Sequence, residues 1–250
     1  MTGSDSQDRT IVHLCLEIAG ERLEADVRLP ARAVRPVDLL PVLMSLDDAL
    51  LAIIERYVAS QGKTISCAKG CGACCRQLVP ITEVDALYLR EIVSEMPDER
   101  RAYVESRFRA ALEELRRSGM LDRLHGVNDL DFEGRQRLSA DYFACGVACP
   151  LLEEESCSIH RDRPLTCREY LVTSPAEECG RPMPQKTARI ALPVKLSQAL
   201  GRFGDGVGRR APRWLPLVLA LDWSAAPQPR VPGPQMFENF LRLVRELAAE

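Results

Sequence analysis

The sequence has no hydrophobic run long enough to cross a membrane. Its most apolar stretch, Trp214–Trp223, is about half the length of a membrane-spanning helix and contains Pro216. The opening residues, M-T-G-S-D-S-Q-D-R-T, are polar and lack the apolar core of a secretory signal. We therefore expect a cytoplasmic protein without a membrane partner, in a compartment that keeps thiols reduced.

The sequence also lacks a strong excess of charge and any familiar catalytic motif. The formal net charge is -3 and the two signs are mixed along the chain, so nucleic acid is not an expected partner. No Ser/His/Asp arrangement, phosphate loop or paired-carboxylate motif stands out, so the sequence assigns no enzymatic activity. Gly204–Gly208 resembles a nucleotide-binding turn without a surrounding strand–turn–helix pattern, and we predict a loop there. Glu153–Glu155 is expected to be a solvated turn.

Cysteine, in contrast, is abundant and clustered. Four of the ten cysteines fall in the stretch C-A-K-G-C-G-A-C-C, Cys67–Cys75, and a second tract holds Cys149, Cys157, Cys167 and Cys179. Disulfides, core packing and redox chemistry are alternatives to metal binding. A reducing compartment disfavours disulfides, and four thiols beside Lys69 and Arg76 are not typical of a core. We therefore predict thiolate ligands that converge at about 2.3 Å on iron or zinc.

Several residues near these cysteines suit an anionic metal–thiolate site. Gly70 and Gly72 allow a tight turn that directs N–H groups toward sulfur. Positive charge can come from the second tract, where the arginines are Arg161, Arg163 and Arg168. Adjacent cysteines such as Cys74 and Cys75 rarely serve one tetrahedral centre, which suggests two centres.

Apolar periodicity predicts the elements around the two tracts. A β-hairpin is expected over residues 11–29 with a turn at 19–22, and a helix from near Pro41 to near Gly62 that buries one face. That face consists of Leu43, Leu46, Leu50, Ile53 and Tyr57. Thr82 should cap a second helix and Pro97-Asp98 should open a third, whose charges, Arg107 among them, form a solvated face.

The rest of the chain is less periodic. Residues 145–182 are expected to be loops and short turns, residues 190–194 a short strand, and residues 214–223 a helix. A stiff loop over 227–234 should lead to a last amphipathic helix with an inward face. The residues of that face are Phe237, Phe240, Leu241, Val244 and Leu247.

Together these elements predict a mainly α protein with a small β-hairpin, an α+β class in which irregular cysteine-rich metal-binding loops pack on helices. We divide it into an N-terminal hairpin and helix (1–62), a cysteine-cluster metal-binding domain (63–182) and a C-terminal helical extension packed on the same core (183–250). Cys15 and Cys145 are interpreted as core residues, and His13 and His125 as structural.

Longer sequence motifs in the two tracts resemble those of a known family. C-x3-C-x2-C-C is followed by Cys149-Pro-Leu-Leu152, Cys157-Ser-Ile-His160 and Arg163-Pro-Leu-Thr-Cys167-Arg-Glu-Tyr170. This order resembles the YkgJ-type cysteine-cluster family, also described as the CxxCxxCC zinc- or iron-chelating domain and found mostly in uncharacterised bacterial proteins. The resemblance covers roughly Cys67 to Cys179.

The resemblance implies that eight cysteines bind iron or zinc. Carried over by position, the ligands are Cys67, Cys71, Cys74, Cys75, Cys149, Cys157, Cys167 and Cys179, with the least motif around Cys179. His160 stands where relatives often have tyrosine, and we interpret it as a packed residue near the ligands rather than a ligand.

Four functions are compatible with these residues. The first is an iron–sulfur or zinc protein with a redox or accessory role, iron–sulfur being favoured. A structural zinc module for an unknown protein partner is the main alternative. Flagellin lysine N-methylases are similar to this family in their cysteine domain, which raises a component related to such an enzyme as a third. A radical S-adenosylmethionine enzyme is disfavoured, because no β/α units follow the C-x3-C-x2-C spacing.

Overall fold

The computed structural model describes residues 9–18, 20–181, 187–204, 208, 212–224 and 226–248. The chain divides into two compact units. The hairpin unit comprises Met1–Lys63, Ala191–Arg213 and Ala226–Glu250, and the cysteine unit comprises Thr64–Ile190 and Trp214–Ala225. The division into three domains made from the sequence remains a prediction about which segments fold together.

The fold class is confirmed. The chain is 53% helical with eight helices in its described part, its strands form small antiparallel pairs, and its cysteines lie in loops. Within the same residues, none of the helices has both the length and the apolar character that a membrane span requires.

The predicted β-hairpin is confirmed in the hairpin unit. Strands β1 (Arg9–Ile18) and β2 (Glu21–Pro30) pair antiparallel, with Ile18 opposite Glu21. The strands therefore begin to pair immediately after Gly20, whose positive φ of 80° favours glycine. The predicted turn was too long, because Glu21 and Arg22 already belong to β2, while Ala19 lies outside the described residues.

The helix expected from near Pro41 is α1 (Leu40–Ser60), preceded by β3 (Ala33–Val34) and a short 3-10 helix, η1 (Pro36–Leu39). Four of the five residues of its predicted face are buried. Tyr57 is the exception, with 49% of its surface exposed, while its neighbour Val58 is the buried residue of the last turn.

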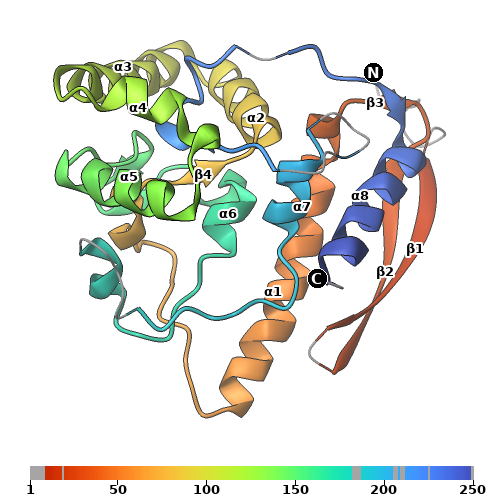
Figure 1. Ribbon diagram of the computed structural model, residues 1–250. Coiled ribbons are helices and arrows are strands. Elements are labelled where there is room, and N and C mark those ends of the chain that lie inside the picture. Colours follow the sequence, from red (N-terminus) through yellow and green to blue (C-terminus); the bar gives the residue numbers. More distant parts are fainter. Residues whose placement is uncertain are drawn as a thin grey trace. The chain divides into compact units, whose positions relative to one another are not determined.

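The C-terminal helix is confirmed as α8 (Gly233–Ala248), which lies in Figure 1 between the hairpin and α7 (Leu196–Arg202). Phe240 packs edge-on against Phe203 with ring centroids 5.5 Å apart. The loop predicted over 227–234 was too long, because β8 (Val231–Pro232) pairs with β3 and the helix begins at Gly233. The strand predicted at 190–194 is wrong: these residues have no strand or bridge pairing, and the bridge of Val172 with Arg189 lies just before them.

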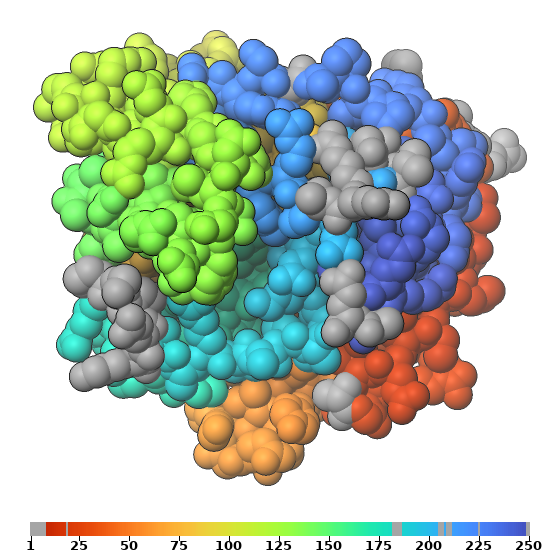
Figure 2. Space-filling view, in the orientation of Figure 1, coloured from red at the N-terminus to blue at the C-terminus, as the bar shows by residue number. Residues whose placement is uncertain are grey.

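The helices of the cysteine unit that follow the first tract are α2 (Glu83–Ser94), α3 (Asp98–Arg117), α4 (Met120–His125) and α5 (Phe132–Ala144), with a 3-10 turn, η3 (Val127–Asp129), before α5. The predicted cap is confirmed, since Thr82 Oγ1 accepts a hydrogen bond from the Asp85 amide over 3.0 Å. Helices α4 and α5 were not predicted. In Figure 2 the side chains of α3, α4 and α5 lie next to one another on one face of this unit.

The second cysteine tract consists of turns and short elements, as predicted. These are β5 (Leu152–Glu153), β6 (Ser156–Cys157), η4 (His160–Asp162), α6 (Leu165–Arg168) and η5 (Ala176–Gly180). The helix predicted at 214–223 is wrong. That segment forms β7 (Leu215–Pro216), paired with β4 (Pro80–Ile81), and a single 3-10 turn, η6 (Leu217–Leu219).

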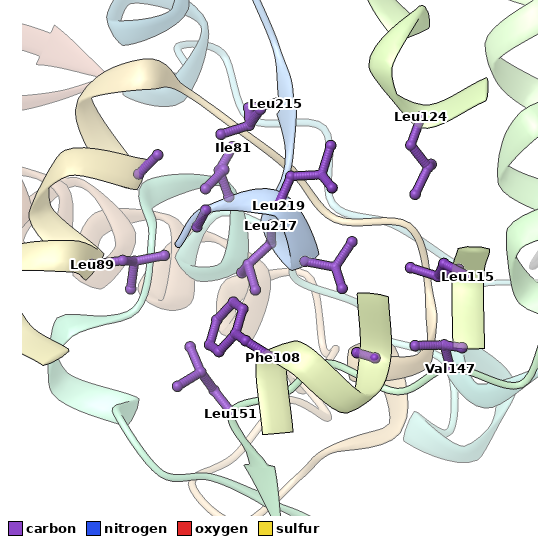
Figure 3. Packing of buried hydrophobic residues seen from close by; sticks show 14 of the residues in the cluster. Ile81, Leu89, Phe108, Leu115, Leu124, Val147, Leu151, Leu215, Leu217 and Leu219 are labelled. Atoms are coloured by element: carbon purple, nitrogen blue, oxygen red, sulfur yellow. The ribbon is translucent and has the colours of Figure 1, made fainter. Parts of the chain in front are cut away.

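The helix predicted at 214–223 is wrong because the middle of this segment is buried. Leu217, Val218 and Leu219 are all buried, so the segment is apolar all round rather than along one stripe. Figure 3 shows Leu217 and Leu219 near Phe108 and Leu115 of α3 and Ile81 of β4. Three cysteines of the second tract pack against this same core, namely Cys149, Cys157 and Cys167. The core therefore fixes where the second tract lies.

Two further predictions concern loops. The turn at Gly204–Gly208 includes residues 205–207, which lie outside the described residues. Glu153–Glu155 does lie in a turn, between β5 and β6, where Glu154 and Glu155 have positive φ values of 47° and 59°. Its carboxylates are not simply solvated, however, because two of them form ion pairs described below.

Candidate metal centre

The first tract forms a short loop that ends in a 3-10 turn, η2 (Ala73–Arg76). Gly70 has φ of +94°, so the turn after Lys69 requires glycine. The Cys71 amide bonds the Ala68 carbonyl over 3.1 Å, and the Cys75 amide bonds the Gly72 carbonyl over 3.0 Å. These bonds leave all four thiols half-buried at the surface of the unit.

Two backbone hydrogen bonds and one side-chain hydrogen bond tie the first tract and its flanking residues to the second tract. The Cys149 amide donates to the Cys75 carbonyl over 2.7 Å, and the Ser66 amide donates to the Val172 carbonyl over 2.9 Å. The side chain of Gln77 donates to the Cys179 carbonyl over 2.9 Å. The two tracts are distant in sequence, yet they are held in direct contact.

Gly72 makes this contact possible. A β-carbon at this position would lie 2.3 Å from Leu152 Cδ1 and 2.6 Å from the Glu155 carbonyl oxygen. Both distances are shorter than van der Waals contact allows, and the carbonyl belongs to the backbone. The sequence analysis attributed Gly72 to a tight turn, whereas the structure shows that the β5–β6 hairpin requires the missing side chain.

Three arginines hold the same hairpin. Arg100 pairs with Glu153 at 2.6 Å, Arg76 pairs with Glu155 at 2.5 Å, and Arg107 donates to the Leu152 carbonyl. Arg107 had been placed on a solvated face, which is wrong. We call Arg76, Arg100 and Arg107 the arginine clamp. No periodic pattern marks it in the sequence, because its partners come from a distant turn.

Burial makes the thiols of the two tracts reluctant to ionise. It raises the pKa of Cys149 to about 12 and that of Cys167 well above its ordinary value, and it also raises the pKa of three others. These are Cys67, Cys157 and Cys179. The pKa of Cys74 is raised above all by a hydrogen bond with the adjacent Cys75 thiol, and then by burial.

The mutual repulsion of the thiolates shows which cysteines are neighbours. Burial is the largest cause of the raised pKa of five other cysteines, and negative charge on Cys74 is a smaller cause. These five come from both tracts: Cys67, Cys149, Cys157, Cys167 and Cys179. Charge on Cys71 acts on Cys67 and Cys179, whereas Cys149 and Cys157 act on Cys167. The charge of Cys74 thus acts on thiols of both tracts, namely on Cys67 and Cys179 and on Cys149, Cys157 and Cys167.

The sulfur atoms are not arranged as a finished coordination sphere. Among the described residues, no three His, Cys, Asp or Glu side chains converge in a way that would hold a metal ion. All ten cysteines, each in the described part of the chain, are free thiols. The fold assembles the cysteine-bearing segments, and metal binding would require the sulfurs to turn toward common points.

Positive charge lies beside the thiols. The charge of Arg163 lowers the pKa of Cys67, Cys74 and Cys157, and so partly opposes the burial that raises it. The Nε atom of Arg163 is buried and has no hydrogen-bond partner among the described residues. Arg168 donates to the Arg161 carbonyl over 2.6 Å and thereby fixes η4. Arg163 therefore has a donor that a thiolate could use.

The remaining candidates lie apart from this site or at its edge. Cys15 is exposed on β1, so its assignment to a core is wrong, because it lies on the outer face of the hairpin beside Arg22. Cys145 is half-buried at the end of α5 and packs on the core. His160 is half-buried in η4, and burial together with the charges of Arg163, Lys69 and Arg168 lowers its pKa.

The comparisons with known proteins agree with the location of this site. Residues 66–187 match the family model CxxCxxCC, described as "Putative zinc- or iron-chelating domain". The resemblance seen in the sequence is therefore confirmed for this segment, which makes up just under half of the chain and contains the whole site. No curated protein and no solved structure matches the chain.

Proposed function

We propose that the cysteine unit is a metal-binding module whose ligands come from both tracts. The proposed ligands are Cys67, Cys71, Cys74, Cys75, Cys149, Cys157, Cys167 and Cys179. The observation that carries the proposal is the direct contact of the two tracts, in which the Cys149 amide donates to the Cys75 carbonyl over 2.7 Å. Eight thiols of this kind suit soft or borderline metals, since thiolate is their preferred ligand.

The grouping of the thiols supports two centres with four ligands each. Cys67, Cys71 and Cys179 would serve one centre, and Cys149, Cys157 and Cys167 the other. Cys74 and Cys75 would supply one ligand to each, because adjacent cysteines rarely bind one tetrahedral centre together. Their thiols, which are hydrogen-bonded to each other, would have to separate when the metals bind. Arg163 would offset part of the negative charge of the thiolates.

We infer that the metal is iron, held as iron–sulfur clusters, and that the role is redox or accessory. Eight thiols exceed what one structural zinc requires, and an iron–sulfur cluster supplies one-electron transfer when it is bound. The half-buried position of the first-tract thiols supports exchange with a partner at the surface. The free thiols agree with a reducing cytoplasm.

Metal and sulfide analysis tests this proposal. Protein purified without oxygen is expected to contain iron and acid-labile sulfide. It should also absorb broadly at ~400 nm, as thiolate-bound clusters typically do. Iron without sulfide would overturn the cluster assignment, and the absence of both iron and zinc would overturn metal binding.

A structural zinc module is the second candidate, and one observation favours it. Cys149, Cys157 and Cys167 pack against the apolar core, so a metal bound there would add directly to the stability of the fold. Colourless protein with about two zinc ions per chain, lost together with the folded state on chelation, would select this candidate over the first.

A further inference from the structure

Tyr170 lies next to two candidate ligands that are far apart in the sequence. The Cys67 Sγ atom lies 3.6 Å from the Tyr170 carbonyl oxygen, which accepts a hydrogen bond from this thiol. The Tyr170 hydroxyl lies beside the Cys179 side chain, close enough to lower the pKa of its thiol. Cys67 and Cys179 belong to the same proposed centre. Tyr170 therefore borders this centre with both its backbone and its side chain.

The position of Tyr170 is fixed by the segment that follows the second tract. The Ile190 amide donates to the Leu171 carbonyl over 2.9 Å, and Val172 forms an antiparallel bridge with Arg189. The guanidinium carbon of Arg189 lies 5.2 Å from the centroid of the Tyr170 ring, in a cation–π contact. These contacts place the ring and its hydroxyl without the help of a metal.

The Tyr170 hydroxyl is buried and lacks a good acceptor. The side chains of Cys179 and Thr187 lie close to it, yet among the described residues its oxygen has no hydrogen-bond partner of standard geometry. Buried hydroxyls are nearly always paired. A neutral thiol is a weak acceptor, whereas a thiolate accepts a strong, charge-assisted hydrogen bond. Ionisation of Cys179, which metal binding requires, would supply the missing acceptor.

The charges around Tyr170 suit a hydrogen-bond donor. Burial raises the pKa of Tyr170, while the charge of Arg189 opposes this effect. The hydroxyl therefore keeps its proton, and the guanidinium strengthens it as a donor. Burial also raises the pKa of Cys179, whereas the Tyr170 hydroxyl lowers it. The contact thus favours the thiolate, which is the form that binds metal.

We propose that Tyr170 is a positioning residue of the centre formed with Cys67 and Cys179, and that its hydroxyl donates to the Cys179 thiolate in the metal-loaded protein. The inference rests on the proposed function, because the acceptor is a metal-bound sulfur. Hydrogen bonds to ligand atoms orient the ligands, increase metal affinity and help to set reduction potentials. Tyr170 acts through Cys179 and does not itself bind the metal.

Tyr170→Phe tests the hydroxyl alone, because the ring, the carbonyl and the contact with Arg189 remain. Metal-free full-length protein is titrated with Co²⁺ without oxygen, and thiolate-to-cobalt absorption reports binding. We expect the affinity of one proposed centre to fall by about tenfold or more. The melting temperature of the metal-free protein should not fall, since removal of an unpaired hydroxyl leaves no partner unsatisfied. In iron-loaded protein the reduction potential should become more negative, because a hydrogen bond to sulfur is lost.

Tyr88→Phe is the matched control, because the Tyr88 hydroxyl donates to Asp162 over 3.2 Å, a carboxylate instead of a thiol. It should leave the cobalt affinity within about twofold of that of the unmodified protein. Unchanged cobalt affinity in Tyr170→Phe, or equal losses in both variants, would overturn the role of Tyr170 and leave metal binding by the thiols intact.

Melting temperatures separate this role from packing. If Tyr170→Phe lowered the melting temperature of the metal-free protein as much as that of the cobalt-loaded protein, Tyr170 would serve packing alone and the inference would be wrong. If the unmodified protein showed no thiolate-to-cobalt absorption, the proposed function would fail, and the inference would fail with it.

Discussion

The backbone amide of Cys149 donates a hydrogen bond to the carbonyl oxygen of Cys75 over 2.7 Å. This bond joins the last cysteine of the first tract to the first ligand candidate of the second. Since the bond belongs to the backbone, it holds the tracts together whatever the orientation of the sulfurs. The fold therefore prepares the site before any metal binds, and the thiols complete it.

Replacement of Cys74 should disturb the site more than replacement of a cysteine outside it. Cys74→Ser is expected to lose at least one of the two proposed centres and to lower the melting temperature, because metal binding contributes to folding free energy. Cys15→Ser is the matched control, since Cys15 is exposed on β1. Equal metal content in the two variants, measured by elemental analysis, would remove Cys74 from the ligand set.

A side chain at position 72 should push the two tracts apart. The β-carbon of Gly72→Ala would meet Leu152 Cδ1 at 2.3 Å and the Glu155 carbonyl at 2.6 Å, so the hairpin must move. We expect a loss of about 1–3 kcal/mol in the unfolding free energy of the metal-free protein, together with lower metal content.

Gly126→Ala provides the comparison for this prediction. A β-carbon at position 126 would have the Arg123 carbonyl oxygen as its nearest neighbour, at 3.7 Å, which is an ordinary van der Waals distance. Denaturant unfolding of both variants gives the difference directly. If Gly72→Ala were no less stable than Gly126→Ala, the close approach of the hairpin would be wrong.

The arginine clamp should contribute measurably through Arg100 and Glu153. Both side chains are partly buried, with 33% and 24% of their surface exposed, and Arg100 Nη2 lies 2.6 Å from Glu153 Oε1. A double-mutant cycle with Arg100→Ala and Glu153→Ala should give a coupling free energy of about 0.5–1 kcal/mol that decreases with added salt.

The pair of Arg116 and Glu113 on the same helix is the control. These side chains are 62% and 55% exposed, and such pairs typically couple by about 0.3–0.5 kcal/mol. A cycle in which Arg100 and Glu153 couple no more strongly than this exposed pair would show that the clamp does not hold the hairpin.

The buried thiols should make the metal-free protein sensitive to alkaline pH. Burial raises the pKa of Cys149 from 9.0 to about 12, so the unfolded chain loses this proton at a lower pH than the folded chain. Since the folded state then binds more protons, its stability falls as the pH rises above 9.0 toward about 12. Unfolding free energies of the metal-free protein, measured from pH 7.5 to 10.5, should decrease accordingly.

Cys149→Ser should reduce this alkaline loss of stability, and Cys15→Ser should leave it unchanged. Metal binding displaces the same protons, so the apparent metal affinity should rise with pH and protons should be released on loading. A metal-free protein whose stability does not change over that pH range would contradict the burial of these thiols.

Local patterns account for the elements that the sequence predicted well. The alternation in residues 9–30 and the apolar faces of α1, α2, α3 and α8 depend on neighbours within one element. Thr82 caps α2 through its side-chain hydroxyl, which accepts from the nearby Asp85 amide. Residues 214–223 were misjudged, because a segment buried on all sides has no amphipathic stripe from which its conformation can be read. Helices α4 and α5 were missed for lack of a clear stripe.

The sequence by itself determined which residues are candidates for metal binding, because the spacing of the thiols and the motifs around them require no tertiary contact to be recognised. It marked both tracts and all eight candidate ligands. Only the tertiary structure decided how the tracts meet, with Gly72 against the β5–β6 hairpin, the arginine clamp on that hairpin, and the Cys149 amide on the Cys75 carbonyl. These contacts join residues far apart in the chain, and their geometry depends on packing around a shared apolar core.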